Sequence, residues 1–178
     1  MNKIEYFEEY GKINTKRSIE IVLEYLKENK IEFVAVASTT GATGVEFARA
    51  LEGKTKVLAI TYREMKLELK KAITKHGAIA IEKAHVPFDY DGTENLIRET
   101  YRTISQGFKV AVEVILIATD LGIILPGKEV IGVAGTEKGA DTIIIGKSTK
   151  TKDIFSEDEE KKFEIHKILA FPKMKFWW

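Results

Sequence analysis

Apolar and polar residues follow two periodicities along the chain. Short apolar runs rich in β-branched side chains predict buried strands at 33–37, 56–60, 78–81, 130–134, 142–145 and 168–171. Apolar residues spaced three and four apart predict helices over 15–29, 44–51, 64–75, 93–105 and 108–121. Strands that alternate with helices predict an α/β fold, with a three-layer, doubly wound and mostly parallel sheet.

The loop lengths refine this architecture. The loop 135–141 is short, so we expect strand 142–145 to return antiparallel as an edge hairpin. The length of 178 residues predicts a single domain over 1–178. Ligands of such sheets bind beyond the carboxyl ends of the strands, where the strand order reverses. The loops that follow strands are therefore the candidate binding segments.

The segment Ser38-Thr39-Thr40-Gly41-Ala42-Thr43-Gly44 joins the strand 33–37 to a helix and contains only small residues. Backbone N–H groups at a helix N-terminus suit a phosphate or carboxylate, and the hydroxyls could add donors. The segment matches neither a Walker loop nor the Gly-x-Gly-x-x-Gly pattern. An ordinary turn with a Ser or Thr N-cap remains the alternative.

Charge and composition limit the partners. Twenty-eight Lys and Arg balance 27 Asp and Glu, so nothing requires nucleic acid or a membrane as a partner. Cysteine is absent, which suits a reducing compartment, and the N-terminus does not resemble a signal peptide, so we expect a cytoplasmic protein. The apolar stretch 108–125 contains three charged residues, which favours a buried helix over a membrane span.

Two further groups of polar residues are candidates for a site. Lys109, Glu113 and Asp120 are spaced four and seven apart, so they form one stripe that faces either solvent or a ligand. His85, Asp89 and Asp91 share a loop, but their spacing matches no known metal site, and we predict none. No residue could be assigned a catalytic role.

Two stretches carry a family resemblance, FVAVASTTGATGVEFARALEGKTKVLAIT and the glycine-rich hairpin KEVIGVAGTEKGADTIII. Both resemble the C-terminal α/β domain of pyruvate kinase, in which the first stretch corresponds to a strand, a phosphate loop, a helix and a strand. Residues 5–172 resemble stand-alone proteins of this type still more closely, through Asn14-Thr15, VEVILIATDLGIILP and GADT. The resemblance implies that the first predicted strand, 33–37, lies beside the fourth, 130–134.

The resemblance also implies a phosphate site, because the related loop of pyruvate kinase holds phosphorylated effectors. Ala42 replaces an arginine that is common in the family, which disfavours a bisphosphorylated sugar. We expect no pyruvate kinase activity, since the catalytic barrel requires about 200–250 residues. On resemblance we predict flavin mononucleotide (FMN), or failing that another phosphorylated small molecule, bound by Asn14, Thr15, Ser38, Thr39, Thr40, Gly41, Ala42, Thr43, Glu113, Asp120, Gly135, Thr136, Gly139, Ala140, Asp141 and Thr142.

Three functional readings remain open. The protein could be a flavin-dependent oxidoreductase or a flavin holder. It could instead be a regulatory or scaffold module that senses a phosphorylated metabolite without redox chemistry. A structural protein would bind no phosphate ligand at all. A homo-oligomer is compatible with each reading.

Overall fold

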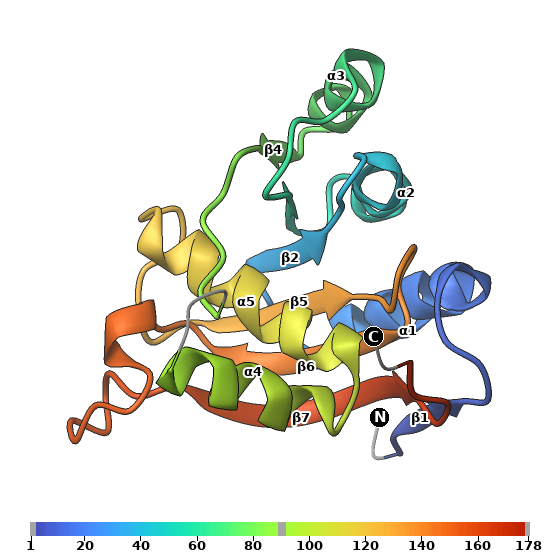
Figure 1. The fold of residues 1–178 in the computed structure, drawn as a ribbon. Coiled ribbons are helices and arrows are strands. Elements are labelled where there is room, and N and C mark those ends of the chain that lie inside the picture. Colours follow the sequence, from blue (N-terminus) through green and yellow to red (C-terminus); the bar gives the residue numbers. More distant parts are fainter. Residues whose placement is uncertain (1–2, 89–91, 177–178) are drawn as a thin grey trace.

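The computed structural model describes residues 3–88 and 92–176, and the described residues form one sheet (Figure 1). Its order is β1-β7-β6-β5-β2-β3-β4. The strands are β1 (Glu5–Phe7), β2 (Phe33–Ala37), β3 (Lys56–Ile60), β4 (Ile79–Ile81), β5 (Glu129–Ala134), β6 (Thr142–Lys147) and β7 (Glu164–Pro172). The predicted α/β class is confirmed.

The sheet is mostly parallel, with antiparallel pairing where β6 joins β5 and β7. The antiparallel hairpin β5–β6 is confirmed, and so is the pairing of β2 with β5 that the resemblance implied. The hairpin does not lie at the edge, however, because β7 and β1 extend the sheet beyond β6. That part of the prediction was wrong.

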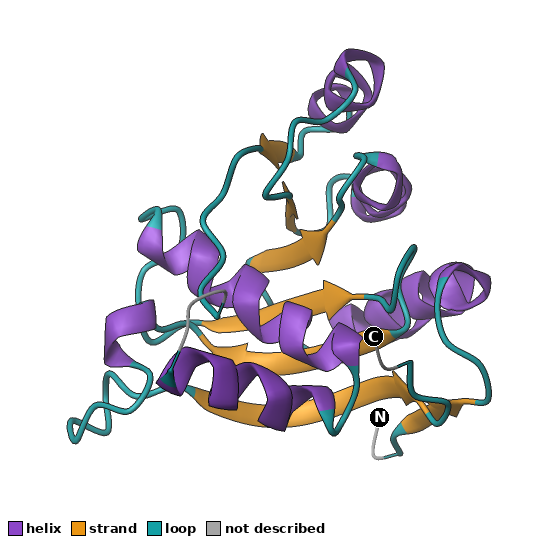
Figure 2. Ribbon diagram, in the orientation of Figure 1, coloured by secondary structure: helices purple, strands orange, loops and turns teal. Residues whose placement is uncertain are grey.

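Helices cover both faces of the sheet and produce three layers (Figure 2). Side chains of the first three helices pack in one apolar cluster and those of the last two in another. The helices are α1 (Thr15–Glu28), α2 (Ala42–Leu51), α3 (Leu67–Lys75), α4 (Thr93–Arg102) and α5 (Gln106–Asp120), with 3-10 turns η1 (Lys12–Asn14) and η2 (Thr151–Asp153). Each face thus buries its own core.

Several element boundaries differ from the sequence-based expectation. Helix α2 begins at Ala42, so the connecting loop ends at Gly41. Helix α5 begins at Gln106, because the side chain of Ser105 accepts a hydrogen bond from the Phe108 N–H at 2.9 Å and caps the helix. Among the described residues, no helix is long and apolar enough to cross a membrane.

Candidate functional site at the carboxyl end of the sheet

The strand order reverses between β2 and β5. From β2 the chain proceeds through α2 to β3 on one side, whereas β5 lies on the other side. The two strands are parallel neighbours, with Val36 opposite Val133, so the loops that follow them leave the same edge of the sheet side by side. In Figure 1 the arrowheads of both strands point to this edge. Open α/β sheets bind ligands at such a position.

The loop after β2 is built around Ser38. Its N–H donates to the Ile60 carbonyl at 2.9 Å, and its buried Oγ accepts from the Gly44 N–H at 2.8 Å. Ser38 therefore satisfies an N–H group in the first turn of α2, although the N-cap residue itself is Gly41 and not a Ser or Thr. Thr39, Thr40 and Ala42 are the exposed members of the segment.

Gly41 sets the direction in which α2 starts. Its φ is +99°, a conformation that glycine adopts without strain. A Cβ at this position would lie 2.8 Å from the Leu69 Cβ of α3. Glycine is therefore required both by the backbone and by the approach of α3.

The loop after β5 is organised by the buried carboxylate of Asp141. Its Oδ2 accepts hydrogen bonds from the Gly11 N–H at 2.7 Å and the Thr136 N–H at 2.8 Å, and its Oδ1 accepts from the Thr142 hydroxyl at 2.7 Å. The carboxylate is fully buried. Asp141 thus holds the N-terminal segment against the β5–β6 loop.

The start of α1 supports the same loop. The Ala140 N–H donates to Thr15 Oγ1 at 3.1 Å, and the Ser18 hydroxyl donates to the Ala140 carbonyl at 3.0 Å. Asn14 Nδ2 donates to the Glu9 carbonyl at 2.8 Å. Of the predicted residues here, Asn14, Gly135 and Gly139 are half-buried, whereas Thr15, Thr136, Ala140, Asp141 and Thr142 are buried.

The predicted polar stripe on α5 is divided between two places. Lys109 and Glu113 are 7% and 4% exposed and form an ion pair of 2.8 Å, so this part of the stripe does not face solvent. Asp120 ends α5 near the amino ends of the strands, where its Oδ1 accepts from the Thr151 N–H at 2.9 Å. The structure does not bring Asp120 to the other predicted residues.

His85 has a structural partner. Its Nε2 lies 2.9 Å from Asp120 Oδ2. Asp89 and Asp91, the other members of the weighed metal group, lie outside the described residues. Within 3–88 and 92–176, His, Asp and Glu side chains form no cluster that could hold a metal ion.

Three side chains of this region, those of Tyr62, Arg63 and Lys175, are absent from the predicted set of ligand-binding residues. The Thr61 hydroxyl donates to the Thr39 carbonyl at 3.2 Å, so the exposed pair Tyr62 and Arg63 directly follows a residue in contact with the loop after β2. The loop 61–63 follows a strand and so was among the candidate binding segments, but its individual side chains were not predicted as ligand-binding. Lys175, interacting electrostatically with Asp141, also belongs to this region, and burial lowers its pKa below the usual lysine value.

Two open hollows lie elsewhere. One, of about 630 Å³, borders β7, and another, of about 650 Å³, lies at the amino ends of β2, β3 and β5. The candidate site therefore rests on the loops and their donors rather than on a deep cavity. A search against protein-family models finds none that matches the chain.

Proposed function

We propose that this protein binds a phosphate-bearing small molecule, FMN being the favoured ligand, at the carboxyl end of the sheet. The observation that supports this proposal is the N-terminus of α2 at the β2/β5 switch point, with the hydroxyl-bearing residues Thr39 and Thr40 exposed beside it. The helix dipole there favours an anion, although the Ala42 N–H already donates to Thr40 Oγ1 at 3.5 Å and the Gly44 N–H to Ser38 Oγ. As part of the same proposal, we infer that the fold is of the pyruvate kinase C-terminal domain type.

The β5–β6 loop contributes rigidity to the proposed site. Asp141 and Thr15 are engaged in holding this loop, so they act on a ligand through the backbone they position. Exposed Tyr62 offers a flat ring near the loop after β2, with the Arg63 guanidinium 5.0 Å from its centre. An aromatic ligand can stack on such a surface.

The test is a visible spectrum of the purified protein followed by titration with FMN. Thr40→Glu places a carboxylate beside the proposed phosphate position, and we expect FMN affinity to fall about tenfold or more, a loss of about 1.4 kcal/mol. Thr74→Glu, at an exposed position of α3, is the matched control and should bind as the wild type does. Gly41 is unsuitable for this test because its substitution strains the fold.

The outcomes separate the candidate functions. A flavin spectrum that co-purifies or titrates in supports the FMN site. If the protein does not bind FMN but binds inorganic phosphate, and Thr40→Glu abolishes the phosphate binding, the result supports the metabolite-sensing module. If the Thr40→Glu protein still binds FMN and inorganic phosphate as the wild type does, the loop after β2 is not the binding site.

A further inference from the structure

A second candidate site lies at the opposite end of the sheet from the proposed FMN site. It is the hollow of about 650 Å³ at the amino ends of β2, β3 and β5. We call it the amino-end hollow. Its lining residues are Lys30, Ile31, Glu32, Lys54, Thr55, Lys56, Lys128 and Glu129.

Four lysines converge on the amino-end hollow from three separate connections. Lys30 precedes β2, Lys54 and Lys56 lie at the start of β3, and Lys128 precedes β5. The three strands are parallel neighbours in the order β5-β2-β3, so their amino ends meet at one edge. The topology therefore gathers ammonium groups that the sequence separates by up to 98 positions, from Lys30 to Lys128.

The protein supplies little neutralising charge to these lysines. Lys56 Nζ donates to the Gly77 carbonyl at 2.8 Å, but Lys30, Lys54 and Lys128 make no side-chain ion pair or hydrogen bond within the described ranges. Like charges held at one edge repel one another unless an anion lies between them. The lining of the amino-end hollow thus carries four lysines against two glutamates, a net positive charge.

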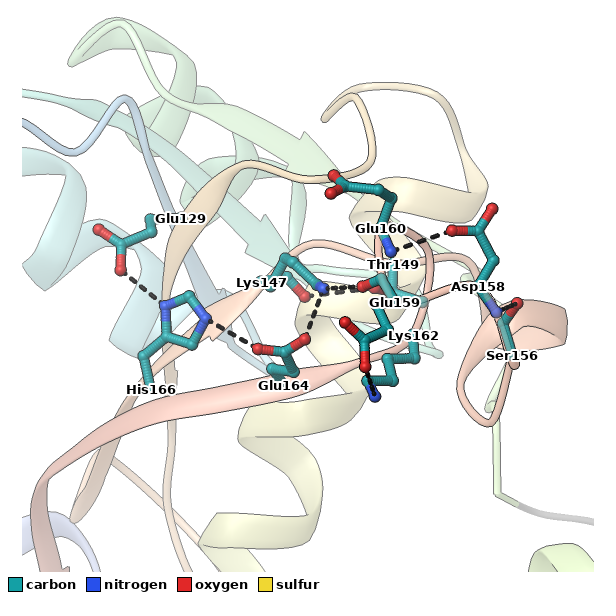
Figure 3. Close-up of polar contacts among 10 residues, drawn as sticks. All are labelled: Glu129, Lys147, Thr149, Ser156, Asp158, Glu159, Glu160, Lys162, Glu164 and His166. Carbon is teal, nitrogen blue, oxygen red and sulfur yellow. Dashed lines mark hydrogen bonds and ion pairs between the residues drawn. The ribbon is translucent and has the colours of Figure 1, made fainter.

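The two glutamates of the hollow offset only part of the charge of the four lysines. Glu129 Oε1 is engaged 2.8 Å from His166 Nδ1, and Figure 3 shows His166 between the carboxylates of Glu129 and Glu164. Glu32 makes no ion pair with any lysine of the described residues. The Glu129 carboxylate therefore pairs with His166 of β7 and not with a lysine of the hollow.

We propose that the amino-end hollow binds a small polyanion of the di- or triphosphate class. Lysine ammonium groups are point charges suited to phosphate oxygens, and several of them match a ligand that carries several negative charges. The volume suits a small molecule, since ligand pockets span about 300–1,000 Å³. This site is independent of the proposed FMN site.

The test uses inorganic tripolyphosphate as the probe, with binding followed by calorimetry at low and at physiological salt. Wild-type protein should bind it, more weakly as salt increases, because salt screens exposed charges. Lys54→Glu with Lys128→Glu should weaken binding about tenfold or more. Lys66→Glu with Lys71→Glu, at the N-cap and in the middle of α3, makes the same change of net charge away from the hollow and should leave binding nearly unchanged.

Three results would overturn the proposal. These are no binding of tripolyphosphate by the wild type, an equal loss of binding in both double variants, and tighter binding of a single-stranded oligonucleotide than of tripolyphosphate. FMN titration of the Lys54→Glu, Lys128→Glu protein separates the two sites, since it should match the wild type. A negative result for the ligand at one end of the sheet then does not affect the proposal for the ligand at the other end.

Discussion

At the scale of single residues, buried polar side chains in this protein act mainly on the backbone. Asp141 satisfies the N–H of Gly11, a residue 130 positions away, and Ser38 satisfies the N–H of Gly44. Buried polar groups are costly unless they are hydrogen-bonded, so each of these side chains determines where a loop can lie. The loops at the carboxyl end therefore owe their positions to these buried side chains.

The ion pair of Lys147 with Glu164 predicts a pH dependence of stability. The Lys147 ammonium, 2.8 Å away, holds the pKa of Glu164 below its usual value. The stabilisation it gives is present above the unfolded pKa of about 4.3 and is lost as pH falls through the depressed folded pKa. Lys147→Met should therefore raise the pKa of Glu164 and destabilise the protein more at neutral pH than in acid.

Urea unfolding across the acid range, with an NMR titration of the Glu164 carboxyl, measures both effects. Lys147 also donates to the Glu159 carbonyl at 2.7 Å, and the loss of that bond lowers stability equally at every pH. Lys152→Met, at an exposed lysine on η2, is the control and should leave the titration of Glu164 unchanged. A difference between wild type and variant that stays constant with pH would contradict the prediction.

At the scale of elements, α2 depends on close contact with β3. A Cβ at Gly44 would lie 2.6 Å from the Ala59 Cβ, although the helical backbone itself accepts alanine. Gly44→Ala should therefore destabilise the protein by about 1–2 kcal/mol, as overpacking outweighs the better helix propensity. Adding Ala59→Gly removes the clash, so the double variant should be more stable than the sum of the two single changes predicts.

Urea denaturation of the wild type, the Gly44→Ala and Ala59→Gly single variants and the double variant gives the coupling free energy between the two positions. Glu46→Ala, at an exposed position of the same helix, is the control and should stay within about 0.5 kcal/mol of wild type. Additive effects of Gly44→Ala and Ala59→Gly would show that α2 moves away from β3 without cost.

Hydrophobic periodicity predicted the long elements because each repeats its pattern over several turns or residues. It missed β1, whose three residues pair with the end of β7, since Glu5 lies opposite Ala170 and no local pattern reveals so distant a partner. Helical spacing also led to the wrong expectation that Asp120 lies near Glu113. Spacing places Asp120 on the stripe of Glu113, but a helix rises 1.5 Å per residue, so the two lie about 10 Å apart along α5.

At the scale of the whole molecule, we propose a ligand site at each end of the sheet. The carboxyl end presents the N-terminus of α2 and exposed hydroxyl-bearing residues at the β2/β5 switch point, and the amino end presents lysines from three connections. The sequence predicted the loop at the carboxyl end because its small residues are contiguous. The lysines of the amino end are scattered along the chain, so only the sheet order could bring them together.

Ligand binding at the carboxyl end predicts a change in thermal stability. A ligand that binds only the folded state, at a hundredfold excess over its Kd, stabilises it by about 2.7 kcal/mol. For a chain of 178 residues this corresponds to a rise in Tm of about 5–10 °C with FMN. Differential scanning fluorimetry or calorimetry measures the shift.

Riboflavin, which has the same ring without the phosphate, isolates the contribution of the loop after β2. It should raise Tm less than FMN does at equal concentration, and Thr40→Glu should reduce the FMN shift to the riboflavin level. Lys54→Glu with Lys128→Glu should keep the full FMN shift, because those lysines lie at the other end of the sheet. Equal shifts with FMN and riboflavin in the wild type would mean that the ring alone is recognised, and that the N-terminus of α2 holds no phosphate.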